Sequence, residues 1–219
     1  MTVLEIILNK LKPQYMSESE VAGSDIYMHE SVTFRQGNKY LINAQSGHGK
    51  SSLLNFIYGS SKRYEGHITF KEETLSGHEA VIFETQKLRT HIISYMFQEL
   101  CLFPELTAME NVQLKNRLTN HKDNSEIESM LDMLLPSEKK GQPVGTLSIG
   151  QQQRVAAVRA LCQPFKFLLL DEPFSHIDKE NARLVANLII QEVDAQGAGL
   201  IITSLDRSDA IPCDYILNL

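Results

Sequence analysis

The sequence has little cysteine and no long apolar run, and each lack excludes a class of protein. Its three cysteines, Cys101, Cys162 and Cys213, have no paired spacing for a metal or redox site, so we expect reduced, packing thiols in a cytoplasmic protein. No run approaches the ~20 apolar residues that span a bilayer. Residues 1–11 lack the basic start and apolar core of a signal peptide. Any contact with a membrane is therefore expected to come through a partner.

The chain also lacks an excess of basic residues, repeats and low-complexity segments. Lysine and arginine number 21 against 27 aspartates and glutamates, and the formal charge of −6 argues against a general nucleic-acid binder. With 219 residues, 42% of them hydrophobic, the chain is long enough for one well-buried α/β domain with a small inserted subdomain.

Predicted strands and helices alternate along the chain, which is typical of a parallel sheet covered by helices. The predicted strands are Val3–Leu8, Ile26–Phe34, Lys39–Asn43, His67–Phe70, Ile92–Phe97, Phe167–Leu170, Leu200–Ser204 and Tyr215–Leu219. The predicted helices are Lys50–Tyr58, Ala108–Asn116, Ser125–Leu135, Gly150–Leu161 and Lys179–Ala195. Residues 99–146 offer helical patterns but no convincing strand, so we expect a helical subdomain inserted there.

The segment Ala44–Ser51 has the glycine and lysine spacing of a phosphate-binding loop between a buried strand and a helix. Its backbone N–H groups can point at a phosphate at the helix N-terminus, where the dipole favours negative charge. Lys50 is expected to reach the β- and γ-phosphates, and the Ser51 hydroxyl to ligate Mg²⁺. The candidate nucleotide contacts here are Ser46, Gly47, His48, Gly49, Lys50, Ser51 and Ser52.

Two carboxylates, Asp171 and Glu172, follow the apolar strand Phe167–Leu170 directly. A carboxylate at the carboxyl end of a central strand lies beside the phosphate loop, where Asp171 can hold Mg²⁺. Glu172 is then placed to polarise an attacking water as general base. An acidic pair after a strand is also common in ordinary turns and helix caps, so this pair indicates a catalytic site only together with the other motifs.

A third segment, Leu147–Arg154, reads Leu-Ser-Ile-Gly-Gln-Gln-Gln-Arg. Together with the loop and the acidic pair, it resembles the nucleotide-binding subunits of ATP-binding cassette (ABC) transporters, whose signature is Leu-Ser-Gly-Gly-Gln. The resemblance implies a P-loop NTPase with a central, mostly parallel sheet, an N-terminal antiparallel β portion and an inserted helical subdomain. It spans residues 1–219 as a single domain, with residues 1–98 and 147–219 as the core and about 99–146 as the helical subdomain. Leu102–Thr107 and Glu110–Val112 are similar to the lipoprotein-export and macrolide-export type.

The resemblance also implies roles for individual residues. Two copies would pair head to tail in the ATP state, with Ser148, Gly150 and Gln151 of one signature contacting the nucleotide held by the other copy. Gln98 would ligate Mg²⁺ and link the site to the helical subdomain, which receives an integral membrane permease. The implied catalytic set is Glu172, Gln98 and Lys50; the implied cofactors are ATP and Mg²⁺. The chain would lie on the cytoplasmic face of the membrane through this partner.

Several positions depart from the family pattern. Ala44 and Ile149 replace glycines, so both positions must work at ordinary backbone angles. The switch histidine that should follow Leu200–Ser204 is absent: Leu205 takes its place, or Ser204 if the register shifts by one. His176 and His48 do not obviously substitute, and we interpret both as solvated or interface residues. Tyr15, with Tyr27 as the alternative, is the candidate to stack on adenine.

Other functions stay open from the sequence. The same ATPase could regulate a membrane partner without transport, and the missing histidine could make hydrolysis very slow. A soluble ABC ATPase acting on ribosomes or DNA is disfavoured, because such proteins carry second cassettes or long insertions that do not fit in 219 residues.

Overall fold

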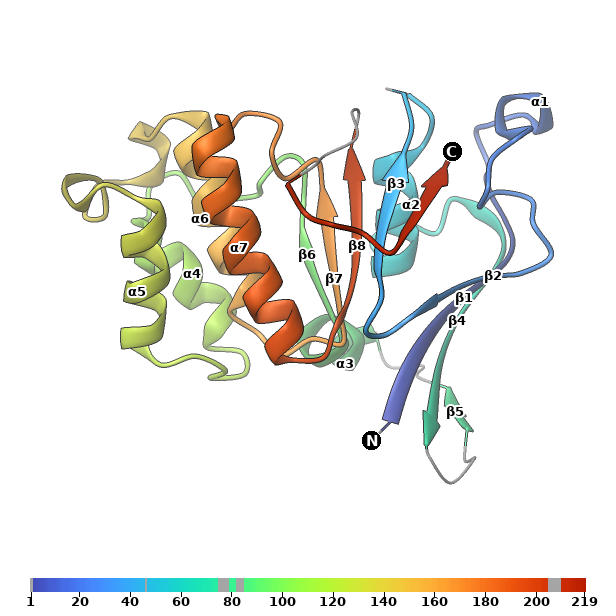
Figure 1. The fold of residues 1–219 in the computed structure, drawn as a ribbon, viewed down its shortest axis with the longest axis horizontal. Helices are drawn as coiled ribbons and strands as arrows, with labels where there is room; N and C mark the ends of the chain where they lie inside the picture. The colour runs from blue at the N-terminus through green and yellow to red at the C-terminus, as the bar shows by residue number, and fades with distance from the viewer. Residues whose placement is uncertain (1, 46, 75–78, 82–84, 205–209) are drawn as a thin grey trace.

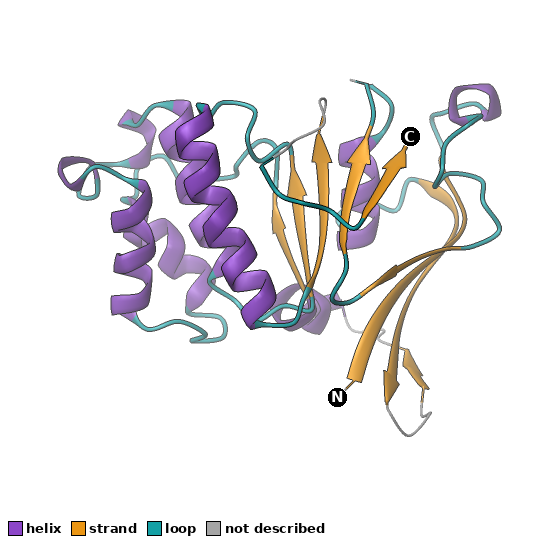
Figure 2. Cartoon of the chain, in the orientation of Figure 1, coloured by secondary structure: helices purple, strands orange, loops and turns teal. Residues whose placement is uncertain are grey.

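The computed structural model describes all residues except 1, 46, 75–78, 82–84 and 205–209. Its centre is a five-stranded parallel sheet with the strand order β6-β7-β8-β3-β9. The strands are β3 (Lys39–Asn43), β6 (Ile93–Met96), β7 (Phe167–Asp171), β8 (Gly199–Ser204) and β9 (Tyr215–Asn218). All five therefore end at one edge of the sheet (Figure 2).

Side chains alternate along the central strands and divide the interior into two cores. Leu168 and Leu170 of β7 pack into one core, whereas Phe167 and Leu169 pack into the other, and all four are buried. The first core lies under the helices α4 (Ala108–Asn116), α5 (Asn124–Leu134), α6 (Ile149–Leu161) and α7 (Lys179–Ala195). The second is closed by α2 (Lys50–Tyr58) and the antiparallel sheet (Figure 1). Burial on both faces explains why these strands read as continuous apolar runs.

The second sheet is antiparallel, with the order β2-β1-β4-β5. It comprises β1 (Thr2–Pro13), β2 (Val32–Arg35), β4 (Tyr64–Thr74) and β5 (Glu79–Val81), and the short helix α1 (Glu18–Val21) follows β1. The predicted strand Ile26–Phe34 is wrong over its first half. Met28 has φ of 65°, which turns the chain, and pairing with β1 begins only at Val32.

The segment 99–146 contains α4, α5 and the 3₁₀ turns η2 (Ser137–Lys139) and η3 (Val144–Thr146), as expected for an inserted helical subdomain. Helices α4 and α5 pack on α6. Capping boxes start both helices, with Thr107 and Glu110 on α4 and Asp123 and Glu126 on α5. Two elements before β6, α3 (Thr85–Lys87) and the π-helical turn η1 (Leu88–Ile92), are not predicted from the sequence. Among the residues that the structure describes, no helix could cross a membrane.

Candidate nucleotide-binding site

Four segments with predicted functional residues meet where the central strands end. The phosphate loop follows β3, Gln98 follows β6, Asp171 ends β7, and Ser204 ends β8. The strand order places β7 and β8 between the other two. Ligands of open α/β sheets bind at this carboxyl edge. The parallel topology thus gathers groups separated by more than a hundred residues in sequence.

The phosphate loop has the backbone that the glycines were expected to provide. Gly47 and Gly49 have φ of 88° and 85°, and Gly49 is the N-cap of α2. Ala44 is not among the residues with positive φ, so alanine fits in the place of the usual glycine. Lys50 is only 5% exposed, and its Nζ donates to the Ala44 carbonyl at 2.7 Å. Ser46, a predicted contact, lies outside the described residues.

Oxygen donors suited to Mg²⁺ lie at the start of α2 and at the ends of β6 and β7. The Ser51 hydroxyl donates to Oε1 of Gln98 at 3.2 Å, so the two predicted ligands are adjacent. Asp171 is 2% exposed, and its Oδ1 accepts a hydrogen bond from the Thr203 hydroxyl at 2.6 Å. The Tyr95 hydroxyl approaches the other oxygen, Oδ2, at 3.4 Å, and burial, then the Asp171 charge, raises the Tyr95 pKa. The site therefore combines a fixed, hydrogen-bonded carboxylate at the end of β7 with a hydroxyl–amide pair that includes Gln98, which follows the neighbouring strand β6.

Glu172 has a strained backbone, with φ of 49°. A non-glycine residue there costs on the order of 1–3 kcal/mol and persists only where its surroundings hold it. Its N–H donates to the Thr203 carbonyl and hydroxyl oxygens, each at 3.2 Å, and its carbonyl accepts from Nε2 of Gln153 at 3.0 Å. Its carboxylate lies 3.4 Å from Nζ of Lys50. The predicted general base thus pairs with the predicted phosphate-binding lysine.

The signature segment forms the start of α6. Ser148 is the N-cap, and its side chain and that of Gln151 form a reciprocal capping box. Ile149 is the first helical residue and is 50% exposed, so this position indeed has ordinary backbone angles. A Cβ on Gly150 would lie 2.6 Å from the His176 carbonyl oxygen. This close approach explains why the second signature glycine is retained where the first is not.

Three residues of this network were missed by sequence reasoning: Tyr95, Gln153 and Thr203. Gln153 is 2% exposed and joins the signature helix to the segment after β7, because its amide also accepts from the His176 N–H at 3.1 Å. Thr203 is fully buried. A polar residue within an apolar strand or on the buried face of a helix was the signal that could have found them.

The two tyrosine candidates have different surroundings. Tyr15 is 58% exposed, and its hydroxyl bonds the Ser52 hydroxyl beside the phosphate loop, which suits a residue that stacks on a base. Tyr27 is 2% exposed, so its ring offers no face to a ligand. The alternative assignment of Tyr27 as the adenine platform is therefore wrong.

The position of the missing histidine is described only in part. Ser204 ends β8 and is paired in register with Asn43, the residue that precedes the phosphate loop. Leu205 lies outside the described residues. His48 and His176 are both exposed, and Nδ1 of His176 bonds the Ser175 hydroxyl at 2.9 Å.

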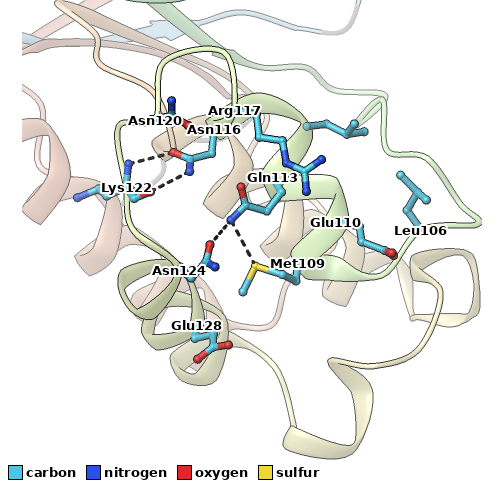
Figure 3. A pocket seen from close by; sticks show the side chains of 11 residues that line it. Leu106, Met109, Glu110, Gln113, Asn116, Arg117, Asn120, Lys122, Asn124 and Glu128 are labelled. Carbon is cyan, nitrogen blue, oxygen red and sulfur yellow. Dashed lines mark hydrogen bonds between the residues drawn. The ribbon is translucent and has the colours of Figure 1, made fainter.

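Among the described residues, two of the hollows lie on the helical portion. One, of about 680 Å³, lies between α4 and α5, where Gln113 donates to Asn124 at 2.6 Å and Asn116 bonds the Lys122 backbone (Figure 3). These bonds tie the two helices together. The other, of about 240 Å³, lies where the Gln98 segment meets α4 and α6. Its lining residues are Tyr95, Phe97, Cys101, Phe103, Leu114, Lys115, Arg159 and Ala160.

The family model described as ABC transporter matches residues 27–175, which include the phosphate loop, the signature and the acidic pair. The chain belongs to the ABC transporter family. It is an ATP-binding and ATP-hydrolysing subunit of such a transporter, and the predicted family and fold class are confirmed.

The ABC subunit is similar to proteins of known and unknown cargo. It is 32% identical over 203 residues to the lipoprotein-releasing system ATP-binding protein LolD of Koribacter versatilis, covering 90% of this chain and 89% of that one. It is 28% identical to the uncharacterized ABC transporter ATP-binding protein YclH of Bacillus subtilis, covering 94% and 88%. The solved dimer of MJ0796, a bacterial ABC transporter cassette, is 26% identical with a TM-score of 0.71, covering 92% and 88%. The LolD similarity agrees with the predicted export subtype.

Proposed function

We propose that this ABC ATPase drives an integral membrane partner by closing and reopening a head-to-tail dimer of itself as it binds and hydrolyses ATP. The convergence of Lys50, the Ser51–Gln98 pair and the Asp171–Glu172 pair at one sheet edge carries the proposal. The dimeric state of the MJ0796 cassette supports the assembly.

Each residue of the site has a distinct proposed role. Lys50 leaves the carboxylate of Glu172 and binds the β- and γ-phosphates, assisted by the backbone N–H groups of residues 47–52. Glu172 accepts the proton of the attacking water. Ser51, Gln98 and Asp171 would hold Mg²⁺, which neutralises phosphate charge when bound. Tyr15 lies against the adenine.

The signature completes the site from the other copy. Ser148 and the Gly150 N–H lie at the N-terminus of α6, where the helix dipole favours a γ-phosphate. In the single chain, Ser148 and Gln151 cap their own helix instead. The γ-phosphate thereby becomes part of the dimer interface, and its loss on hydrolysis favours separation by removing contacts that only the closed state makes.

The membrane partner is proposed to bind the helical subdomain, about residues 99–146, inserted between the core segments 1–98 and 147–219. The hollow beside Gln98 presents Phe103, which is 54% exposed, and the cation of Lys115. Asn111 is fully buried and holds Phe103 in place through both backbone groups, at 2.8 and 3.0 Å. Leu102, by contrast, packs against the core. A partner helix seated here would sense Gln98, and the protein would lie on the cytoplasmic face of the membrane.

Site-specific crosslinking in membranes tests this arrangement. Cysteines at the exposed Glu99 and Glu105, with Cys101 replaced by serine, should capture one integral membrane protein. A cysteine at the exposed Lys62, between α2 and β4, is the matched control and should not. Labelling of soluble proteins alone would refute the partner assignment. In parallel, Lys50→Ala should abolish measurable MgATP binding by calorimetry, and unchanged affinity would refute the site.

A second candidate function is regulation of the membrane partner with slow hydrolysis. The observation that favours it is the absence of the switch histidine, with only a serine at the end of β8. Turnover of the purified protein, measured with and without its crosslinked partner, separates the two.

A further inference from the structure

A buried tyrosine contacts the phosphate loop from the core of the protein. The Tyr27 hydroxyl donates a hydrogen bond to the Gly49 carbonyl oxygen at 2.9 Å, and the side chain is 2% exposed. The same carbonyl accepts the first intrahelical bond of α2, from the Leu53 N–H at 2.9 Å. Two donors therefore fix the direction of this one carbonyl group.

The direction of the Gly49 carbonyl determines the direction in which the N–H group of Lys50 points. In a planar trans peptide, the C=O of Gly49 and the N–H of Lys50 point in opposite directions. With the carbonyl held toward Tyr27, the Lys50 N–H points away from the core, on the side where a phosphate binds. Rotation of this peptide would turn a carbonyl oxygen toward the phosphate instead. The residue itself would not prevent this rotation, because Gly49, with φ of 85°, has no Cβ to restrict its backbone angles.

We propose that Tyr27 is a positioning residue, which holds the Gly49–Lys50 peptide in the orientation that binds phosphate. The inference rests on the proposed nucleotide site. Tyr27 does not contact the nucleotide in this assignment; it acts through the Gly49 carbonyl.

The surroundings of Tyr27 give it the rigidity that this role needs. The Ser24 hydroxyl accepts hydrogen bonds from the N–H groups of Ile26 and Tyr27, at 3.0 and 2.9 Å. Asp25 is tied to β9, because its carboxylate accepts from the Asn218 N–H at 2.7 Å and its own N–H donates back at 2.8 Å. The tyrosine is thus anchored to the edge of the central sheet rather than to a free loop.

The competing explanation is that Tyr27 only fills the core. A core role would be met by phenylalanine, which keeps the ring and loses the hydroxyl. The positioning role predicts that Tyr27→Phe weakens MgATP binding about fivefold, the usual net effect of one neutral hydrogen bond. Since the loop contacts phosphate in both ground and transition states, turnover at saturating ATP should stay within about twofold.

Tyr40→Phe is the matched control. Tyr40 is also a buried tyrosine of the same core, 5% exposed, but its hydroxyl accepts from the N–H of Arg35, the last residue of β2, at 2.8 Å. The Tyr40→Phe substitution should lower the unfolding temperature without changing nucleotide affinity. Magnesium tripolyphosphate lacks adenine. If the effect lies at the phosphates, Tyr27→Phe should weaken its binding by the same factor as the binding of MgATP.

The outcomes are separable. If the wild-type protein binds neither ligand, the proposed function fails and the inference with it. If the wild type binds but Tyr27→Phe binds equally well, or Tyr40→Phe loses affinity to the same extent, the inference alone is overturned. Ser24→Ala is the second variant should Tyr27→Phe not fold: loosening the turn should weaken tripolyphosphate binding in the same direction, and unchanged binding would contradict the positioning role.

Discussion

The pairing of Lys50 with Glu172 leads to a prediction for Glu172→Gln that goes beyond the loss of a catalytic base. The lysine that should bind phosphate lies 3.4 Å from the carboxylate, and the two side chains are 5% and 12% exposed. Nucleotide must therefore compete with Glu172 for Lys50. Replacing the carboxylate by an amide should weaken that competition, so the variant should bind nucleotide more tightly while hydrolysing it far more slowly.

The size of the effect follows from the geometry of the pair. Two unit charges at 3.4 Å with an effective dielectric constant of about 20 attract by roughly 5 kcal/mol before desolvation. A hydrogen bond to a charged group is worth about 1.5–3 kcal/mol net. The glutamine amide oxygen keeps part of this interaction energy, and Lys50 retains its hydrogen bond to the Ala44 carbonyl oxygen. We therefore expect a gain of about 1.4 kcal/mol, or about tenfold in affinity.

ADP is the decisive ligand in this experiment. Glu172 would also repel a γ-phosphate, so tighter ATP binding alone would not identify the cause. ADP lacks that group but still has the β-phosphate that Lys50 binds. Calorimetric titration should therefore show tighter ADP binding to Glu172→Gln than to wild type. Glu192→Gln is the matched control: it weakens another semi-buried pair, with Lys122 at 3.0 Å, and should leave ADP affinity unchanged. Equal ADP affinity of wild type and Glu172→Gln would refute the competition.

Three further predictions concern the signature glycine, the position after β8 and a buried lysine of the helical portion. Gly150→Ala should abolish ATP-driven dimerisation in size-exclusion chromatography but preserve ATP binding by the monomer, because its Cβ would collide with the His176 carbonyl; a normal dimer would contradict this. Leu205→His should raise the ATP turnover number with affinity within a few-fold, whereas Ser204→Ala should slow turnover only if serine is the substitute donor; no response to either would refute both assignments. Burial, then Arg159 and Arg89, lowers the pKa of Lys115 to about 8 from 10.5, so the folded protein binds fewer protons than the unfolded chain between these values. The unfolding free energy of wild type relative to Lys115→Met should therefore rise from pH 7.5 to 9.5 in urea titrations, and a flat difference would contradict the burial.

Individual helices and strands could be predicted wherever a single periodicity of apolar residues dominated the segment. Helices α2, α4 and α7 begin and end at the predicted residues, because an N-cap or an apolar stripe marks each of them. The central strands were recognisable as short apolar runs buried on both faces. The failure over residues 26–31 has a physical cause: an apolar pair precedes Met28, whose positive φ is set by tertiary contacts such as the Met28 N–H to Leu11 carbonyl bond. Local pattern carries no signal for such a contact.

The candidate site was predictable to the extent that its residues lie in contiguous motifs. The loop, the acidic pair and the signature can each be read from a few neighbouring residues. Gln153, Thr203 and Tyr27 could not, because their roles depend on residues 19 to 32 positions away that only the fold brings near. Sequence alone does not tell which of the two tyrosines, Tyr15 or Tyr27, is buried, and so it leaves both as candidates to stack on adenine.

The contacts that the site residues make with one another show why ATP binding should reorganise the site. Lys50 forms an ion pair with Glu172, the Ser51 hydroxyl donates to Gln98, and Ser148 caps its own helix, so these three proposed ligands already have protein partners. These partners satisfy groups that would be costly to leave unpaired, and ATP with its metal must replace them. Since Gln98 directly follows Phe97, which lines the hollow proposed for the membrane partner, release of the Ser51–Gln98 bond is the first change that a seated helix would sense. Under this proposal a bound partner would alter nucleotide affinity in return, because coupling between two sites is reciprocal.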